Sequence, residues 1–386
     1  MNAKFPGIIA LILFLALFLI AASHARNGRG NDPAKNVVSE RLESVGYLPY
    51  VEEEAAPGKL GVTVYDQEYA YTGVNLYTPQ RLGVAYLIGM DGSVLHEWKA
   101  PEGVPDDWVS LKIIDRDNVV VMMQEHLMGM GWDSSIKWVD DNRYHHDFTV
   151  AENGDIYALA KKSRYYRKLG GWILDDYIIV LDRDGEVKKS ISVYELLGGD
   201  FVSKRARLNE TADVFHTNTI DIIDHDIEVG ERGDFILCFR HLDMIAVVDL
   251  EKEEIVWSWG EGILDRPHHP TVLEDGNILV FDNGNNRGYS RVVEYDPGDD
   301  KIVWEYVADK RKSFFTSERG GSQRLPNGNT LITESNKGHV FEVTEKGEIV
   351  WEYWLPEKHE NGRRATLYRM ARLDEETLTP LNGVAA

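Results

Sequence analysis

Short alternating strands separated by tight turns dominate the hydrophobic pattern of this chain. One recurring unit is a turn followed by an apolar strand, as in Asn153-Gly154-Asp155-Ile156, Asp275-Gly276-Asn277-Ile278 and Asn327-Gly328-Asn329-Thr330. Asn-Gly and Asp-Gly steps between alternating runs are the strongest short-range signal for an antiparallel hairpin. Beyond the apolar N-terminal run, the sequence has no helical periodicity of useful length. The pattern therefore predicts an all-β protein.

A second unit is a charged turn followed by an alternating strand with aromatic residues near its end. It recurs as Glu254-Ile255-Val256-Trp257-Ser258-Trp259, Lys301-Ile302-Val303-Trp304-Glu305-Tyr306 and Gly347-Glu348-Ile349-Val350-Trp351-Glu352-Tyr353. The later copies recur about every 50 residues, the length of a four-stranded propeller blade. We expect a six-bladed β-propeller of four-stranded antiparallel blades over residues 61–380, with residues 368–378 supplying a missing strand to the first blade. Seven blades stay open because residues 170–213 are irregular.

The N-terminus has the pattern of an export signal. Lys4 precedes an apolar run over residues 8–22, and the small residues Ser23 and Ala25 follow it. This run of about 15 residues suits a signal peptide and is short for a membrane span of about 20. We expect a signal peptide over residues 1–25, a tether over 26–60, and export to the periplasm or the medium. An uncleaved membrane anchor is the alternative.

Charge limits the partners of this chain. Its formal net charge is −22, whereas proteins that bind phosphate backbones need a basic surface. We therefore expect no nucleic-acid partner. A net negative protein also repels anionic substrates, so any bound anion must lie in a local cationic pocket.

Histidine clusters precede strand-like runs in successive repeats. They are Tyr144-His145-His146-Asp147, Phe215-His216-Thr217-Asn218 and Pro267-His268-His269-Pro270. In a propeller, the chain at these positions enters an inner strand, so we expect the imidazoles to gather at one end of the central channel. Arg240 ends the apolar strand that follows the second cluster.

Each of these residues also has an ordinary structural interpretation, such as a loop hydrogen bond or a salt bridge. Taken together, they suit three chemistries. Imidazoles can bind zinc, but no His-Glu-x-x-His spacing is present and we predict no metal or cofactor. Cationic imidazoles with Arg240 and Asn218 can bind an oxyanion. One imidazole can also attack an electrophilic sulfur or phosphorus and form a covalent intermediate.

These segments resemble the arylsulfate sulfotransferase family, bacterial enzymes that move a sulfuryl group between phenols without an activated nucleotide donor. The resemblance covers roughly residues 63–378. The matching segments are His145-His146-Asp147, His216-Thr217-Asn218, the strand ending in Arg240, His268-His269-Pro270-Thr271, Val280-Phe281-Asp282-Asn283-Gly284, Tyr289-Ser290-Arg291 and Leu325-Pro326-Asn327-Gly328-Asn329-Thr330.

The resemblance implies an aryl sulfate donor, a phenolic acceptor and ping-pong kinetics through a sulfohistidine. His269 would be the nucleophile, although His268 is nearly as good a choice. The resemblance assigns the sulfuryl oxygens and the phenol proton to His216, Asn218, Arg240 and His146. Two other classes of function stay open. One is a non-catalytic propeller that binds a ligand or partner, and the other is a metal-dependent hydrolase.

Overall fold

The computed structural model describes residues 58–115, 117–199, 202 and 212–374. The predicted signal peptide and most of the tether lie outside these residues. Within them the all-β prediction is confirmed, since the only α-helix described is α3 (Val193–Leu197), which Ser192 caps. Three short 3-10 turns are also present: η1 (Arg240–Leu242), η2 (Arg311–Ser313) and η3 (Ser335–Lys337). The helices that the structure describes are all too short to cross a membrane.

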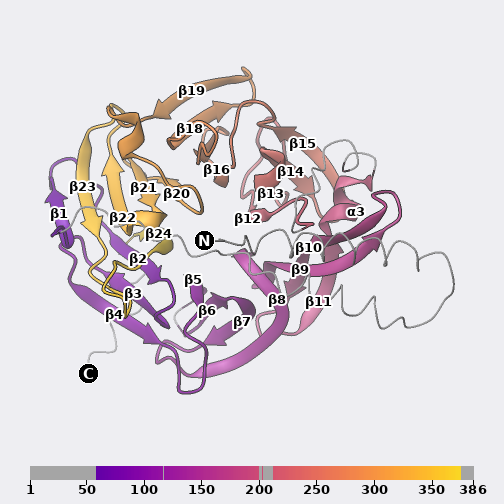
Figure 1. Ribbon diagram of the computed structural model, residues 1–386, viewed down its shortest axis with the longest axis horizontal. Coiled ribbons are helices and arrows are strands. Elements are labelled where there is room, and N and C mark those ends of the chain that lie inside the picture. Colours follow the sequence, from indigo (N-terminus) through magenta and orange to yellow (C-terminus); the bar gives the residue numbers. More distant parts are fainter. Residues whose placement is uncertain (1–57, 116, 200–201, 203–211, 375–386) are drawn as a thin grey trace, which may run out of the picture.

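Antiparallel sheets are arranged around a common centre in a propeller-like manner (Figure 1). Three sheets have four strands each. They contain β24 (Leu367–Leu373), β2 (Val74–Pro79), β3 (Val84–Ile88) and β4 (Val94–Lys99); β12 (Thr217–Ile222), β13 (Phe235–Phe239), β14 (Met244–Asp249) and β15 (Glu254–Trp259); and β16 (His268–Val272), β17 (Ile278–Asp282), β18 (Arg291–Asp296) and β19 (Lys301–Tyr306).

Two further sheets are larger. The five-stranded sheet contains β1 (Gly61–Tyr65), β23 (Ile349–Trp354), β22 (His339–Val343), β21 (Thr330–Glu334) and β20 (Gly321–Arg324). The seven-stranded sheet contains β11 (Val187–Ser192), β10 (Gly171–Leu181), β9 (Ile156–Tyr166), β8 (Ile136–Val150), β7 (Glu125–Met130), β6 (Val119–Met123) and β5 (Trp108–Ile113).

The prediction of six separate four-stranded blades is therefore wrong. Strand β8 pairs with β7 as far as Tyr144 and with β9 from Tyr144 to Val150, so it joins two hairpin groups in one sheet. No glycine or proline interrupts its 15 residues, and nothing local ends the strand between the two groups. Strand β1 also adds an unpredicted fifth strand beside β23.

The predicted closure by the C-terminal strand is confirmed. Strand β24 pairs with β2, with Leu373 opposite Val74 and Met370 opposite Tyr77. This pairing places the last described strand in one sheet with β2, β3 and β4, from the N-terminal part of the described chain. The last residues of the predicted segment, 375–378, lie outside the described residues.

The predicted turns and strands explain how the sheets pack. The apolar strands β13, β17 and β21 are buried along their whole length. Tryptophans of two aromatic-ended strands donate hydrogen bonds to main-chain oxygens at turns of the adjacent sheets. Trp304 Nε1 donates to Glu345 O at 2.8 Å, and Trp351 Nε1 donates to Met90 O at 2.9 Å. These bonds connect neighbouring sheets.

Antiparallel order also positions the histidines. Strands β12, β16 and β20 lie next to one another around the centre (Figure 1). Because successive strands alternate in direction, the start of an inner strand lies at the same end of the sheet as the end of the strand after it. His216 precedes β12, His268 begins β16 and Arg240 follows β13. All three therefore lie on one face, which we call the histidine face.

Candidate active site

Irregular strand pairing positions the imidazoles on the histidine face. The pairing of the inner strands shifts at Tyr144–Phe148 in β8, at Thr217–Thr219 in β12 and at His268–Thr271 in β16. His146, His216 and His269 lie within or beside these shifts and have the positive φ angles 61°, 48° and 49°. A bulge of this kind redirects a side chain away from the normal alternation of a strand.

The rings of three histidines pack edge to face or at a tilt. The centroids of His146 and His216 are 4.7 Å apart, and those of His216 and His241 are 4.6 Å apart. Arg240 Nη1 lies 3.1 Å from His241 Nε2, and Arg240 Nη2 donates to Ser317 O at 3.4 Å. Predicted residues from β8, β12 and the end of β13 therefore meet in one cluster.

Burial and positive charge keep these imidazoles neutral. Burial lowers the pKa of His146, His216 and His268 well below the ordinary value, and the nearby Arg240 guanidinium lowers the pKa of each further. Burial also lowers the pKa of His241 to about 4. Near neutral pH, the positive charge of this cluster therefore comes from Arg240 while the imidazoles act as bases or nucleophiles. We call His146, His216, His268 and Arg240 the Arg240 group.

Buried carboxylates orient two of the imidazoles. His216 Nδ1 lies 2.6 Å from Asp213 Oδ2, and a carboxylate only accepts, so Nδ1 carries the proton and Nε2 the lone pair. His145 Nε2 lies 3.4 Å from Asp176 Oδ1, and His145 Nδ1 lies 2.8 Å from His146 Nδ1. The two Nδ1 atoms share one hydrogen bond, in which either ring can be the donor.

His268 is held by neutral oxygen acceptors. Its Nδ1 lies 2.6 Å from Asn283 Oδ1 and 3.2 Å from Arg266 O, while its Nε2 accepts from the Arg319 main-chain N–H at 3.3 Å. Two acceptors at Nδ1 and a donor at Nε2 define the same tautomer as in His216.

His269 belongs to a different set of neighbours. Its Nδ1 accepts from the Ser322 main-chain N–H at 3.3 Å. Burial lowers its pKa well below the ordinary value, and the charges of Arg369 and Lys112 lower it further. Both His269 and Arg369 pack on Gly321, where an added Cβ would lie 2.9 Å from the imidazole and 2.8 Å from the arginine stem. The structure therefore separates two adjacent histidines that the sequence could not distinguish.

Asn218 holds main chain near the site. Its Nδ2 donates to Pro267 O at 2.8 Å, and its own carbonyl accepts from the Tyr368 hydroxyl at 3.1 Å. The next residue, Thr219, accepts from the His269 main-chain N–H at 3.0 Å. Asn218 thus connects the second histidine cluster to the third through Pro267, the residue that precedes His268.

The sequence interpretation missed several residues of this site, namely Asp176, Asp213, Arg319, Tyr368 and Arg369. Asn283 was in a matching segment of the resemblance but was assigned no role in the site. Arg319 lies just before inner strand β20, where the other repeats carry histidines, and this repeat position is a signal that could have indicated it. Arg369 binds Asp147 Oδ2 at 2.8 Å across 222 residues of sequence, and no local pattern indicates that contact.

Asp213, His216 and His241 form the group of described residues with the spacing of potential metal ligands. Zinc ligands each lie about 2.0–2.1 Å from the metal, so ligand atoms around a tetrahedral ion are more than about 3 Å apart. The 2.6 Å between His216 Nδ1 and Asp213 Oδ2 is instead a hydrogen bond. The observed arrangement fits a carboxylate–histidine pair better than a metal site.

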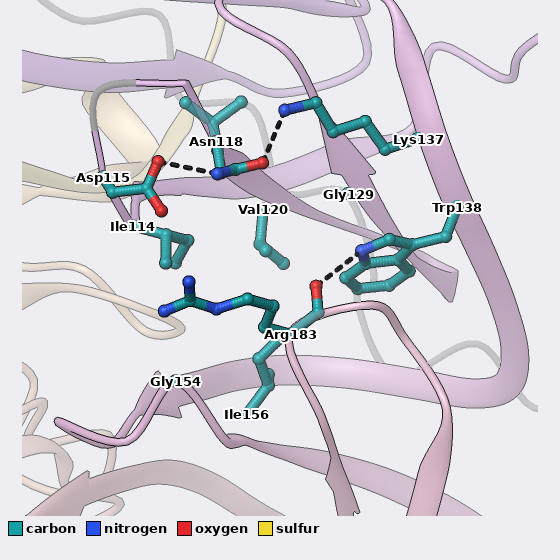
Figure 2. A pocket seen from close by; sticks show the side chains of 11 residues that line it. Ile114, Asp115, Asn118, Val120, Gly129, Lys137, Trp138, Gly154, Ile156 and Arg183 are labelled. Atoms are coloured by element: carbon teal, nitrogen blue, oxygen red, sulfur yellow. Dashed lines mark hydrogen bonds between the residues drawn. The ribbon is translucent and has the colours of Figure 1, made fainter.

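A small cavity lies away from the histidine face (Figure 2). Its lining residues are Ile114, Asp115, Asn118, Val119, Val120, Gly129, Lys137, Trp138, Gly154, Ile156 and Arg183. Trp138 Nε1 donates to Arg183 O at 3.1 Å at its edge, as the figure shows. The cavity shares no residue with the Arg240 group and adds nothing to its chemistry.

Comparison with known protein families decides the affiliation of the chain. The profile of the arylsulfotransferase (ASST) family matches residues 110–355, which is more than half of the sequence. The chain belongs to the ASST family. The matched range includes all three histidine clusters, Arg240 and Asn283. ASST membership supports a transferase of the arylsulfotransferase type, with an aryl sulfate donor and a phenol acceptor as small-molecule substrates.

Solved structures similar to this ASST-family protein are distant in sequence. A protein of unknown function from Bacteroides caccae is 13% identical, covers 73% of this chain and 94% of its own, and has a TM-score of 0.50, which shows a shared fold. A catalytically inactive virginiamycin B lyase variant from Staphylococcus aureus with quinupristin is 14% identical over 78% of this chain and 89% of its own, with a TM-score of 0.47. Among curated proteins, none matches the chain significantly.

Proposed function

We propose that this ASST-family protein transfers a sulfuryl group from a phenolic sulfate ester to a phenol, without a nucleotide donor, through a sulfated histidine. One observation carries the proposal: the rings of His146, His216 and His241 pack on one another, Arg240 bonds to His241, and burial together with the Arg240 charge lowers the pKa of His146, His216 and His268. A neutral imidazole is a nucleophile or a base, and a guanidinium binds the oxygens of a tetrahedral anion through charge-assisted hydrogen bonds.

The neighbouring charges favour His268 as the nucleophile, in the role that the sequence resemblance implied for His269. The lone pair of each ring accepts from a main-chain N–H at 3.3 Å, His268 Nε2 from Arg319 and His269 Nδ1 from Ser322. The neighbouring charges differ, because Arg240 is the strongest charge acting on His268, whereas Arg369 and Lys112 act on His269. In the first half-reaction the His268 Nε2 lone pair forms an N–S bond. The S–O bond to the aryl group breaks, and the phenolate leaves with its electron pair.

His216 suits the role of general base in the second half-reaction. There the acceptor phenol oxygen attacks sulfur, the S–N bond breaks, and the phenol proton must leave. His216 has its lone pair on Nε2, and the Asp213 carboxylate at 2.6 Å stabilises the imidazolium that forms when it takes up the proton. His146 is the neighbouring imidazole that can receive the proton when the acceptor binds on its side.

Arg240 and Asn218 support this chemistry in different ways. A sulfuryl group passes through a loose transition state with charge spread over its oxygens, so catalysis depends on positioning and electrostatics. Arg240 supplies the positive charge, and Asn218 braces Pro267 O beside the nucleophile. This division differs from the expectation that Asn218 itself contacts the sulfuryl oxygens.

Turnover of a fluorogenic aryl sulfate tests the proposal, with and without added phenol and with a chelator control. Release that depends on the acceptor and survives the chelator is the expected result. No release under any condition would favour a non-catalytic propeller that binds a ligand or partner. Release that needs no acceptor and is abolished by the chelator would favour a metal-dependent hydrolase, with Asp213, His216 and His241 as the ligands to examine.

We also propose that the protein is exported, as the apolar run over residues 8–22 predicts. N-terminal sequencing of protein recovered from the host's periplasm or medium tests this directly. A mature N-terminus near Arg26 is the expected result. Intact protein in the membrane fraction would instead support an uncleaved anchor.

A further inference from the structure

We infer that Asn283 is a positioning residue that selects the reacting nitrogen of His268 and keeps the sulfated form of His268 reactive. This inference rests on the proposed function. Asn283 is fully buried at the end of β17, and its Oδ1 lies 2.6 Å from His268 Nδ1. It therefore contacts the ring on the side opposite to Nε2.

The surrounding main chain determines the orientation of the Asn283 amide. Its Nδ2 donates one hydrogen to Thr316 O and the other to Arg319 O, both at 2.8 Å. An amide nitrogen has only two hydrogens, so both are used. The reversed amide would place Oδ1 against two carbonyl oxygens, which also only accept. The oxygen must therefore face His268.

This orientation defines the tautomer of His268. A carbonyl oxygen at 2.6 Å accepts a hydrogen bond, so His268 Nδ1 carries the proton, and Arg266 O at 3.2 Å is a second acceptor for it. The lone pair is then on Nε2. The Arg319 main-chain N–H donates to that nitrogen at 3.3 Å, and this hydrogen bond must break before Nε2 can attack sulfur.

The neutral charge of the amide matters after sulfation. Attack by Nε2 produces a cationic imidazole that keeps its Nδ1 proton. An amide oxygen is too weak a base to remove that proton, so the ring stays cationic and is a good leaving group when a phenol attacks sulfur. A carboxylate at the same position would stabilise the cationic ring or take its proton, and S–N cleavage would then slow.

A second histidine of the same site provides an internal contrast. His216 Nδ1 and His268 Nδ1 both lie 2.6 Å from a side-chain oxygen, but the first partner is the Asp213 carboxylate and the second is the Asn283 amide. A carboxylate suits a base that must hold a proton. A neutral amide suits a nucleophile that must later leave the sulfur.

Replacing Asn283 with aspartate tests this role. For Asn283→Asp we expect the first burst of phenol release to persist while steady-state turnover falls about 10- to 100-fold, the range for changes in groups that orient a reactive side chain. Mass spectrometry should find His268 sulfated for longer than in the wild type. The acid limb of the kcat/KM profile should move to higher pH, because the carboxylate raises the pKa of His268.

A matched control separates this effect from damage to the loop. Ser290 Oγ donates to Asn283 O at 2.9 Å and accepts from Thr316 N at 3.0 Å, so Ser290→Ala weakens the same loop without touching His268. We expect Ser290→Ala to lower Tm and leave the ratio of burst to turnover and the pH profile unchanged. If burst and turnover fall together in Asn283→Asp with an unshifted acid limb, as in Ser290→Ala, Asn283 is only structural.

Measuring the His268 tautomer in the wild-type protein tests the positioning role of Asn283 separately from the proposed sulfuryl transfer. Nitrogen-15 NMR, with the His268 signal assigned from its loss in His268→Gln, should show a protonated Nδ1 and an unprotonated Nε2. The opposite tautomer would overturn the positioning role of Asn283 whatever the activity. If the expected tautomer is found but the protein shows no aryl sulfate turnover, the proposed function is overturned. The role of Asn283 in sulfation then falls with it, and only the contact that orients the His268 ring remains.

Discussion

The two ends of the inner strands use left-handed backbone with different residues. On the histidine face, the residues with positive φ include His146, His216, His269 and Arg319, at 61°, 48°, 49° and 61°. At the opposite end, the turns that follow β8, β16 and β20 use Gly154, Gly276 and Gly328, at 87°, 86° and 87°. These turn positions all have glycine, which adopts this backbone most easily, whereas the four positions on the histidine face have larger side chains.

This difference indicates where the fold tolerates strain. A left-handed conformation costs a non-glycine residue about 1–2 kcal/mol, and strained residues that persist cluster at active sites. At the Gly154 turn, Asn153 Oδ1 accepts from Asp155 N and Gly154 N donates to Ala151 O, so these bonds join neighbouring residues. On the histidine face, the His269 main-chain N–H donates to Thr219 of another sheet, and the His146 ring packs on the His216 ring beside β12.

The largest test of this contrast compares the two adjacent histidines. His268→Gln should lower acceptor-dependent turnover by about 10³-fold or more, because it removes the nucleophile. His269→Asn should lower turnover by no more than about tenfold, because asparagine tolerates the left-handed backbone and His268 stays in place. Steady-state kinetics of both variants measure this difference. The reverse order of effects would return the nucleophile to His269, as the sequence resemblance implied.

A change to the cation of the site should have the next largest effect. Arg240→Lys keeps a positive charge but loses the planar fork that matches sulfuryl oxygens, so we expect kcat/KM to fall about 100-fold. Arg324→Lys is the control, since Arg324 pairs with Glu294 near the turn end of β20. Equal losses in both variants would show that the fall reflects general destabilisation.

Acidification should weaken the histidine face before the turns. Burial lowers the pKa of His146, His216, His268 and His269 well below the ordinary value, and that of His241 to about 4. In the unfolded chain these imidazoles protonate near pH 6.5. As pH falls through that value, the unfolded chain binds more protons than the native one. Stability should therefore fall by about 1.4 kcal/mol per pH unit for each imidazole, down to its folded pKa.

Urea unfolding at a series of pH values between about 7 and 5 measures this slope. His241→Asn should reduce it by about one proton, because asparagine does not titrate. An unchanged slope in that variant would show that His241 is already protonated in the fold.

The local parts of this architecture follow from the sequence, and the long-range parts do not. The Asn-Gly and Asp-Gly turns and the buried strands β13, β17 and β21 have signals within a few residues. The closing strand β24 was predicted from the repeat instead, because the first blade lacked a strand. The continuous strand β8 and the pairing of β1 with β23 depend on which segments meet in space, so the predicted blade count was wrong.

The candidate site also has a part that the sequence predicts and a part that it does not. The histidine clusters and Arg240 were recognisable because each occurs at a repeat position. The choice between His268 and His269 depends on Asn283, Arg319 and Ser322, which contact these rings from segments 15 to 53 residues away in sequence. The backbone bulge in β16 determines which neighbours the His268 and His269 rings contact, and no residue pattern predicts this bulge.

The smallest expected effect comes from changing a glycine at the turn end of the inner strands. An added Cβ at Gly328 has no neighbour within 4 Å, so Gly328→Ala costs only the left-handed conformation, and we expect the free energy of unfolding to fall by about 1–2 kcal/mol. Gly328→Asn should cost less, and the exposed turn residue Glu274→Ala should stay within about 0.5 kcal/mol. Kinetic constants should match the wild type in all three. A loss of turnover in folded Gly328→Ala would mean that strain at the turns also reaches the histidine face, and the two ends of the inner strands would then not be independent.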